Sequence, residues 1–481
     1  MLSDTSTQFA DNPLAALMST ICLHQHDEGY ISTCQGLSAL LTKDKINKQA
    51  IDALIVEIDQ RLSRQMDTIL HHPEFQALES AWRGAHYVVQ HTDFRENSKV
   101  DLVHVSKKEL QEDFAEATEL SQSGLYKLVY SKEYGQFGGE PYGCMVGQYT
   151  FSHHAADVQL LQNIAGVAAM AHAPFIAAAS PTFFGVQCFS ELPHIKDLQP
   201  IFAGAPYAKW RSFRASENAR YVGLTAPRFL LRLPYHPEHH PVRGFHYQET
   251  AHQHGDYLWG NTAYAFATRI MRSFAQYRWC PNIIGPQGGG AVEDLPLHFG
   301  EAMGDIIPKI PTEVMISDRR EYELAEQGFI ALAFRKGSDK AAFFSANSAQ
   351  SPQTFGISEQ GKQSALSVKL GTQLPYLFVV CRIAHYLKVL QREQIGTWKE
   401  RSDLERELNL WLNQYVANQE NAPAHIRSIK PLREARVTVD AEQAEPGWYG
   451  VHIQVRPHFK YMGSDITLSL TGRLETEHML S

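Results

Sequence analysis

Residues 142–151, YGCMVGQYTF, are followed by LLQNIAGVAAMAHA at 160–173 and by FIAAAS at 175–180. The first and third segments are short apolar runs that predict strands, and the Ala-rich middle segment predicts a helix. Strand, helix and strand in this order indicate an α/β layer. The chain is therefore expected to have a mixed α/β (α+β) fold.

Similar patterns extend toward both ends of the chain. DLVHVS at 101–106 predicts a strand and KELQEDFAEATEL at 108–120 a helix. Residues 259–277 and 374–395 predict further helices, and residues 317–346 predict a helix that leads into strands. The C-terminal part returns to alternating apolar and polar residues, which predicts strands at 435–440, 447–459 and 465–475.

Two helices are expected before residue 90. Apolar residues recur at spacings of three and four from Ile51 to Ile69, which predicts a long amphipathic helix that ends before Pro73. Pro73 suits the first turn of a second helix, HHPEFQALESAWRGAHY at 71–87. Phe75, Leu78 and Trp82 share one face of this helix. That face is either a docking surface or part of a core.

Two C-terminal elements carry candidate packing residues. The helix DLERELNLWLNQYV at 403–416 places four residues on one seam: Leu404, Leu408, Trp411 and Tyr415. In the last predicted strand the apolar positions are Ile466, Leu468, Leu470 and Leu474. This strand is either an internal sheet edge or an arm donated to the sheet of another subunit, where main-chain hydrogen bonds supply the binding.

Composition excludes several classes of protein. The 481 residues contain 44 Lys and Arg against 52 Asp and Glu, a net charge of -8, which does not suit a protein that coats nucleic acid. The six cysteines are far apart and form neither a zinc module nor a disulfide framework. The N-terminus has no secretory signal pattern, and polar residues interrupt the most apolar run, 160–179. A cytoplasmic chain is expected, without a membrane partner.

Sequence motifs give weak support for an enzyme. GISEQGKQ at 356–363 has the glycine and lysine spacing of a nucleotide-binding loop, but Gln363 replaces the hydroxyl residue that would hold magnesium. Six histidines cluster in a segment whose prolines disfavour the helix that would bring metal ligands onto one face. They are His236, His239, His240, His246, His252 and His254. GPQGGG at 285–290 lacks the dinucleotide-binding order and predicts a turn. A metal- or nucleotide-dependent enzyme is therefore the alternative hypothesis, and no catalytic, cofactor or metal ligand residues are assigned.

Residues 209–243 raise a third hypothesis. Six arginines alternate there with Trp210, Phe213, Tyr221 and Phe229, a composition found at single-strand nucleic-acid sites and equally at protein interfaces. The negative net charge disfavours the nucleic-acid reading.

Six sequence blocks resemble, in order, those of the TssC (VipB) family, the large subunits of the contractile sheath of bacterial type VI secretion systems. They are residues 71–84, 139–151, 220–235, 259–270, 328–348 and 446–470, from HHPEFQALESAWRG to PGWYGVHIQVRPHFKYMGSDITLSL. The resemblance implies a structural protein with a phage-tail-sheath-like, multi-layer fold, extended terminal arms and no active site.

The resemblance also implies a domain plan. Residues 1–46 would form an N-terminal arm with a short helix, and 47–350 the main α/β body in the outer and middle sheath layers. Residues 351–462 would form an inner domain together with the small subunit, and 463–481 a C-terminal strand arm.

The partners implied by the resemblance are those of a contractile machine. They are the small sheath subunit TssB (VipA), neighbouring copies of the chain, the inner Hcp tube, baseplate components and the AAA+ ATPase ClpV. ClpV would recognise an N-terminal helix, for which the candidates are Leu14, Leu17, Met18 and Ile21. The alternative for this apolar stripe is a helix that folds back on its own domain.

Overall fold

The computed structural model describes most of the chain beyond residue 47. The described residues are 48–134, 136, 138–302, 305–336, 338–352, 371–393, 401–417, 419, 422–441, 448–458 and 468–475. The chain divides into two compact units, one made of residues 1–75 and 234–257 and the other of 76–233 and 258–481.

The first unit contains the long helix α3 (Lys48–Leu70), as the sequence predicts. The segment 234–257 is bound to its C-terminal end by side chains. Tyr247 donates its hydroxyl proton to Asp67 Oδ1 at 2.8 Å, and Glu249 Oε1 lies 3.1 Å from His71 Nε2. Glu249 Oε2 also accepts the backbone N–H of Tyr235 at 2.8 Å. These contacts hold an otherwise irregular segment against the helix.

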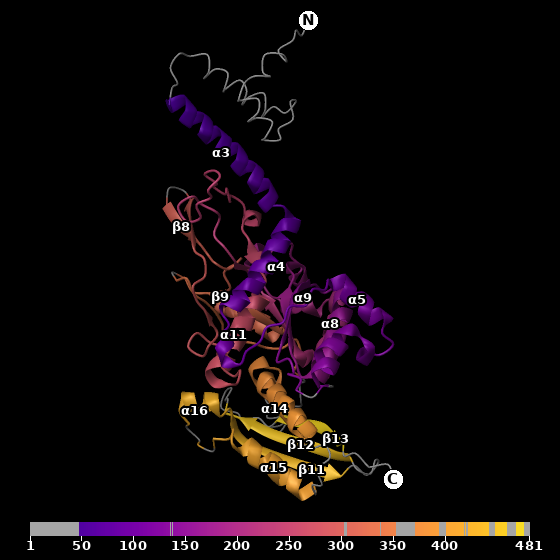
Figure 1. The fold of residues 1–481 in the computed structure, drawn as a ribbon. Coiled ribbons are helices and arrows are strands. Elements are labelled where there is room, and N and C mark those ends of the chain that lie inside the picture. Colours follow the sequence, from indigo (N-terminus) through magenta and orange to yellow (C-terminus); the bar gives the residue numbers. More distant parts are fainter. Residues whose placement is uncertain are drawn as a thin grey trace, which may run out of the picture. The chain divides into compact units, whose positions relative to one another are not determined.

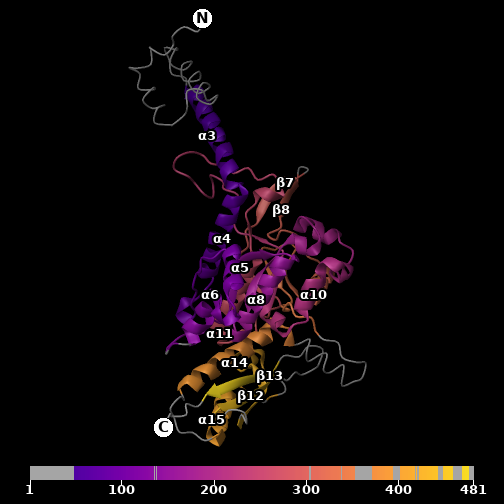
Figure 2. The same ribbon diagram turned by 90° about the vertical axis from the view of Figure 1, so that its right-hand side faces the viewer.

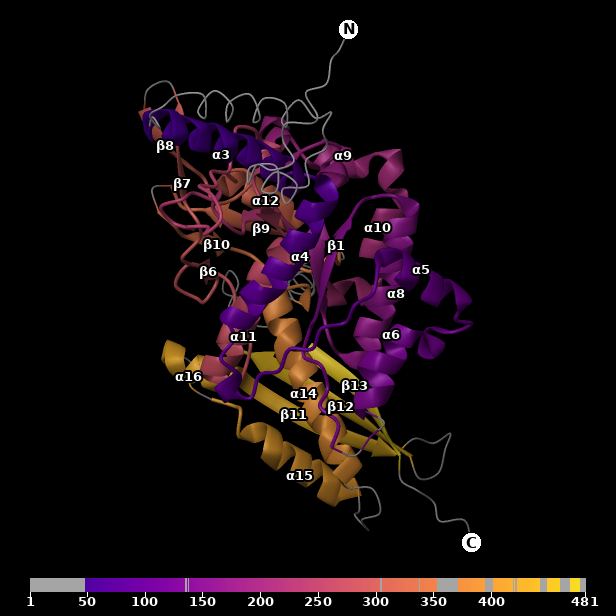
Figure 3. The ribbon, with the colours of Figure 1, turned by 45° about the horizontal axis from the view of Figure 1, so that its top comes forward.

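The second unit is built on a six-stranded sheet, visible behind α4 (Pro73–Gln90) in Figure 3. The strand order is β1 (Met145–Phe151), β2 (Phe175–Ala179), β3 (Val222–Ala226), β9 (Phe329–Phe334), β10 (Ala341–Phe343) and β6 (Ala291–Val292). Strands β1, β2, β3 and β9 run parallel. Strand β10 pairs antiparallel with β9, and β6 pairs antiparallel with β10. The predicted α/β layer is confirmed, with α8 (Ala155–Ala171) as the crossover helix between β1 and β2.

Both faces of this sheet are covered. Every residue of β2 and β3 is buried, as in parallel strands with helices on each side, and α8 and α11 (Thr262–Tyr277) both pack on β1 to β3. An aromatic cluster fills the core next to β9: Phe183, Phe184, Phe202, Trp210 and Phe329.

Shorter elements surround the sheet. The helices are α5 (Lys107–Glu116), α6 (Gly124–Tyr126), α7 (Lys132–Tyr134), α9 (Gln199–Ala203), α10 (Ala208–Arg214) and α12 (Asp318–Glu326). The strand pairs are β4 (Phe229–Leu230) with β5 (Trp259–Gly260), and β7 (His298–Ala302) with β8 (Asp305–Lys309). Residues 285–290 form the predicted turn, in which Gly285 and Gly289 have positive φ.

The predicted strand at 101–106 is wrong. These residues form an irregular connection, in which Leu102 and Val103 are 67% and 55% exposed. An apolar run becomes a strand only when a neighbouring strand completes its hydrogen bonds, and none lies beside it in the described structure. The connection ends at Ser106, whose side chain accepts the N–H of Glu109 in a capping box that starts α5.

The C-terminal part of the second unit has its own sheet, core and helices (Figure 1). Strands β11 (Leu432–Ala441), β12 (Trp448–Pro457) and β13 (Leu468–Glu475) form an antiparallel sheet in that order. Helices α14 (Leu374–Glu393) and α15 (Arg401–Asn413) supply apolar side chains to its core, and α16 (Ala424–Ile429) precedes β11. The three predicted strands and both long helices are confirmed.

Candidate assembly interfaces

Strand β13 forms one edge of the C-terminal sheet. It pairs with β12 of the same chain in a regular antiparallel register from Val455 with Leu468 to Trp448 with Glu475. No other described strand pairs with it. In this single chain the last strand is thus an internal edge, and an edge strand is a template for adding a strand from another chain. Ile466 lies outside the described residues.

The opposite edge, along β11, is closed. Val437 donates its N–H to Asn409 Oδ1 at 2.9 Å, and Asn409 Nδ2 donates back to Val437 O at 2.8 Å. Glu405 Oε2 accepts the N–H of Val439 at 3.3 Å. At the start of the strand, Leu432 exchanges backbone hydrogen bonds with Tyr415 and Ala417. Helix α15 and the turn after it therefore occupy the positions that a further strand would need.

Two of the four residues predicted to form the seam of α15 are buried, and two are half-buried. Leu408 belongs to the C-terminal core together with Leu412, and Leu404 is buried outside that cluster. Trp411 and Tyr415 are half-buried at the border of the C-terminal core, where their rings pack edge to face on each other with centroids 5.4 Å apart. Tyr415 lies beyond the end of the helix, in the turn that covers Leu432. The turn thus connects the seam of α15 to the edge of β11, because Tyr415 accepts the N–H of Leu432.

The predicted apolar face of α4 is exposed. The helix begins at Pro73, as the sequence predicts. Leu78 and Trp82 are 56% and 65% exposed, and Phe75, also exposed, precedes them on the same helix. Of the two interpretations left open by the sequence, the described structure favours a docking surface over a core.

The face of α4 that packs in the second unit is made of small residues. Ser80, Gly84 and Val88 are its buried positions, and Ser80 donates its hydroxyl proton to Trp259 O at 2.9 Å. Gly84 lies against the ring of Tyr264, and a Cβ on Gly84 would come within 2.3 Å of that ring. The spacing of large apolar residues did not predict this face, because α4 approaches its neighbours closely here through small residues such as Ser80 and Gly84.

Helix α14 joins the two cores of the second unit. Leu374, Leu377, Phe378 and Cys381 belong to the core of the large sheet, and Val379, Ile383 and Leu387 to that of the C-terminal sheet. Beyond them, α14 covers the C-terminal end of α8. His385 Nε2 lies 3.1 Å from Ala171 O, and Lys388 Nζ lies 3.4 Å from Met170 O.

This junction is rich in buried polar groups. Tyr134 donates its hydroxyl proton to Ala171 O at 3.0 Å, and the Lys388 ammonium lies over the rings of Tyr130 and Tyr134. Burial lowers the pKa of His385 to about 3 and that of His172 to about 4, with nearby cations lowering both further. Both imidazoles are therefore neutral at pH 7, so that His385 can donate its Nε2 proton to the last turn of α8.

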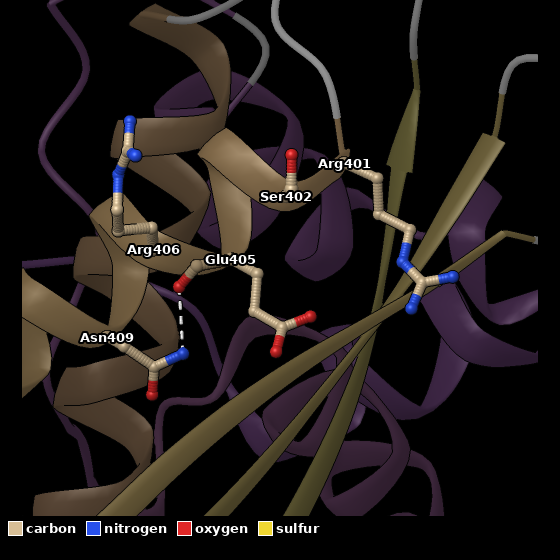
Figure 4. Close-up of a pocket in the computed structure, with 5 residues that line it drawn as sticks. All are labelled: Arg401, Ser402, Glu405, Arg406 and Asn409. Atoms are coloured by element: carbon tan, nitrogen blue, oxygen red, sulfur yellow. Dashed lines mark hydrogen bonds between the residues drawn. The ribbon is translucent and has the colours of Figure 1, made fainter.

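Two hollows on the described surface are candidate small-molecule sites. A hollow of about 510 Å³ is lined by Arg401, Ser402, Glu405, Arg406 and Asn409 of α15, and Figure 4 shows these side chains around it. Glu405 and Asn409 bind the edge of β11, which gives them a structural role. A second hollow, lined by aromatic residues and Arg278, lies beside Trp279 and Tyr386.

The histidine cluster does not assemble a metal site. No group of three or more His, Cys, Asp or Glu side chains among the described residues could hold a metal ion. His236 and His239 have ring centroids 6.0 Å apart, and the His240 ring packs edge-on against Tyr235. The nucleotide-loop candidate at 356–363 lies outside the described residues, as do Leu14, Leu17, Met18 and Ile21.

The aromatic residues of the arginine segment are internal to the chain and offer no surface to nucleic acid or to another protein, whereas Arg211 and Arg243 are exposed. Trp210, Phe213 and Phe229 are at most 1% exposed. Arg214 donates to Ala349 O, Glu326 O and Gln327 Oε1, each at 3.0 Å. Two further arginines form ion pairs within the second unit, Arg228 with Glu313 and Arg232 with Glu79.

Comparison with known proteins matches both sheets to domains of tail sheath proteins. The model of the EvpB/VC_A0108 tail sheath N-terminal domain (VipB) covers residues 52–350, and that of the tail sheath gpW/gp25-like domain covers 363–474. The chain belongs to the VipB family of tail sheath proteins. The family resemblance is confirmed, and the chain is a large sheath subunit of the TssC/VipB type.

Two individual proteins are also similar to the chain. The chain is 42% identical over 446 residues to the type VI secretion system sheath protein TssC1 of Pseudomonas aeruginosa PAO1, covering 91% of this chain and 88% of that protein. A solved structure of the baseplate of the anti-feeding prophage aligns with 80% of this chain and 80% of its own, at 8% identity and a TM-score of 0.33. Among the described residues, no helix combines the length and apolar character that a membrane crossing requires.

Proposed function

We propose that this chain forms the sheath of a type VI secretion system in the bacterial cytoplasm, paired with a small sheath subunit of the TssB (VipA) type. The observation that carries the proposal is the family match over both folded sheets, from residue 52 to residue 474. The open edge of β13 and the exposed apolar face of α4 support it, because both are surfaces that a polymer can cover. The role is structural, without catalysis.

The formation of a long tube from many copies can be explained by the geometry of the contact that each copy repeats. A contact between different surfaces of identical units, whose rotation does not close into a ring, gives an open helical array. Such a tube would surround Hcp rings and start at the baseplate. Contraction would need no nucleotide, because the extended lattice would be a metastable arrangement whose body-to-body contacts improve on shortening. ClpV would then recycle the contracted form through the N-terminal segment that includes Leu14 and Ile21.

Strand exchange would keep the tube connected during this change. In the single chain β13 pairs with β12 through a regular register. The β13 of a second copy has the same sequence and fits the same position on β12, as in domain swapping. A tethered strand would let the globular bodies rotate against one another without separating. The predicted arm residues Leu468, Leu470 and Leu474 belong to this strand.

Electron microscopy of the chain co-expressed with its small subunit tests the sheath function. We expect hollow tubes from the wild-type pair. A variant lacking residues 465–481 should still bind the small subunit but should not polymerise. A discrete soluble complex under every assembly condition would overturn the sheath proposal, and tubes of normal length from the truncated chain would overturn strand donation.

Cross-linking tests the exchange itself. Gln454 and Ser469 are paired across β12 and β13, so cysteines at these positions lie within disulfide range. One copy would carry Gln454→Cys and a second, differently tagged copy Ser469→Cys. A disulfide between the two copies in assembled tubes supports exchange. Its absence, while one chain with both cysteines forms the bond internally, shows that β13 stays in its own sheet.

A further inference from the structure

The two edges of the C-terminal sheet differ in their backbone hydrogen bonding. Successive residues of an antiparallel strand direct their N–H and C=O groups alternately to the two sides. Val437 and Val439 therefore face the same side of β11, away from β12. Both groups of Val437 and the N–H of Val439 are bonded to side chains of α15.

The hydrogen bonds continue to the start of the strand. A bulge between Leu432 and Glu434 shifts the alternation, so that Leu432 also faces outward. Leu432 donates its N–H to Tyr415 O at 3.3 Å, and its carbonyl accepts the N–H of Ala417 at 2.9 Å. The outer edge of β11 is thus occupied at Leu432, Val437 and Val439. At the other side of the sheet, β13 pairs with β12 and has no second strand on its outer side among the described residues.

Asn409 makes the most strand-like of these contacts. Its amide accepts from and donates to the same residue, as a neighbouring strand would, while its Nδ2 also donates to Glu405 O at 2.8 Å within α15 (Figure 4). Asn can supply a donor and an acceptor at once, which Asp, Leu and Ala cannot. The residue type therefore suits the closure of a strand edge.

We propose that Asn409, assisted by Glu405, is an edge lock: it blocks strand addition at β11, so that the strand of a second copy can enter the sheet only on the β13 side. The inference rests on the strand exchange proposed above and assigns the residues that restrict it to one side. Without the lock, each sheet would offer two edges, and copies would also join through β11.

Hydrogen–deuterium exchange of the full chain in complex with its small subunit tests the lock. In Asn409→Ala and Asn409→Leu the protection of the Val437 amide should fall about tenfold, because one part-buried hydrogen bond is lost. Asn409→Asp keeps the acceptor and should keep most of this protection. Asn413→Ala is the matched control, since Asn413 is an exposed residue one turn further along α15.

Self-association gives the second readout. Sedimentation velocity of the Asn409→Ala/Glu405→Ala double variant should show concentration-dependent species larger than those of the wild type or Asn413→Ala. Unchanged exchange at Val437 would overturn the lock, and so would a double variant that sediments like the control. Neither outcome bears on tube formation by the wild-type chain, so failure of the lock is distinguishable from failure of the sheath function.

Discussion

His385 is buried and His172 is half-buried, and in each imidazole Nδ1 is a buried atom without a hydrogen-bond partner in the described structure. His172 ends α8 in the left-handed conformation, and His385 reaches the same helix end from α14. Burial lowers the pKa of each group, so the folded protein keeps both neutral where an unfolded chain would protonate them.

Stability is therefore expected to fall with acid. Between the unfolded pKa of about 6.5 and the folded value near 4 or 3, the unfolded state binds more protons, so each histidine lowers the free energy of unfolding by about 1.4 kcal/mol per pH unit as the pH falls. Urea unfolding between pH 7 and pH 4.5 measures this. His385→Gln keeps a donor for Ala171 O and should reduce the slope by one proton, and an unchanged slope would contradict the assignment.

Gly84 is a position where even one added carbon atom would disturb the packing. In Gly84→Ala the new Cβ would clash with the Tyr264 ring, and overpacking of this kind lowers the free energy of unfolding by about 1–3 kcal/mol. Chemical denaturation measures the loss. His86→Ala, at an exposed position of the same helix, is the control and should change little. If the clash is the cause, Tyr264→Leu should restore part of the stability of Gly84→Ala.

At the level of elements, α4 presents large apolar side chains to solvent and small ones to its own domain. Burying a side chain such as Trp82 or Leu78 contributes about 1.5–3 kcal/mol. The proposed occupant of this face is a neighbouring sheath subunit, since nothing in the described part of the chain covers these residues to that extent.

Substitution on this face should separate folding from assembly. We expect Trp82→Glu to change the free energy of unfolding by at most about 0.5 kcal/mol, because the side chain is largely exposed. The same variant should reduce co-purification with the small subunit or the yield of tubes. Ala77→Glu adds the same charge at an exposed position on another side of α4 and should assemble normally. Normal assembly of Trp82→Glu would exclude this face as a contact.

The elements also show what the sequence could and could not predict. The spacing of apolar residues was enough to predict the strands and helix of 142–179, helix α14 and the C-terminal strands, because in each the apolar side chains recur with the period of the element that forms. Periodicity groups Phe75, Leu78 and Trp82 on one face but does not tell which side of the helix the rest of the chain covers. The strand expected at 101–106 failed for lack of a partner strand, which local pattern does not reveal. The arginine segment misled because buried arginines bonded to carbonyl groups have the composition of a binding surface.

For the second unit as a whole, α14 links the two cores, because its side chains belong to both. Figure 2 shows this helix beside the C-terminal strands. A helix that two cores share cannot lose its packing in one without exposing apolar surface in the other. The large sheet and the C-terminal sheet should therefore unfold together.

Hydrogen exchange in urea tests this cooperativity. Amides of β2 and β12 should report the same free energy of opening. Ala384→Gly, in the middle of α14, should lower both by about 1 kcal/mol, because glycine is a poor helix former. A second variant, Lys430→Ala, lies outside α14 at an exposed site and serves as the reference. Two separate transitions, or an effect confined to β12, would show that the cores are independent.

If β13 is exchanged between copies, a truncated copy that is mixed with intact ones should change the length of the tubes. A copy without β13 would still present β12 to an incoming strand but would have none to pass on, so it would act as a terminator that ends a row of linked subunits. Mixed with intact copies, it should shorten tubes in proportion to its share, even though it folds and recruits its neighbour normally.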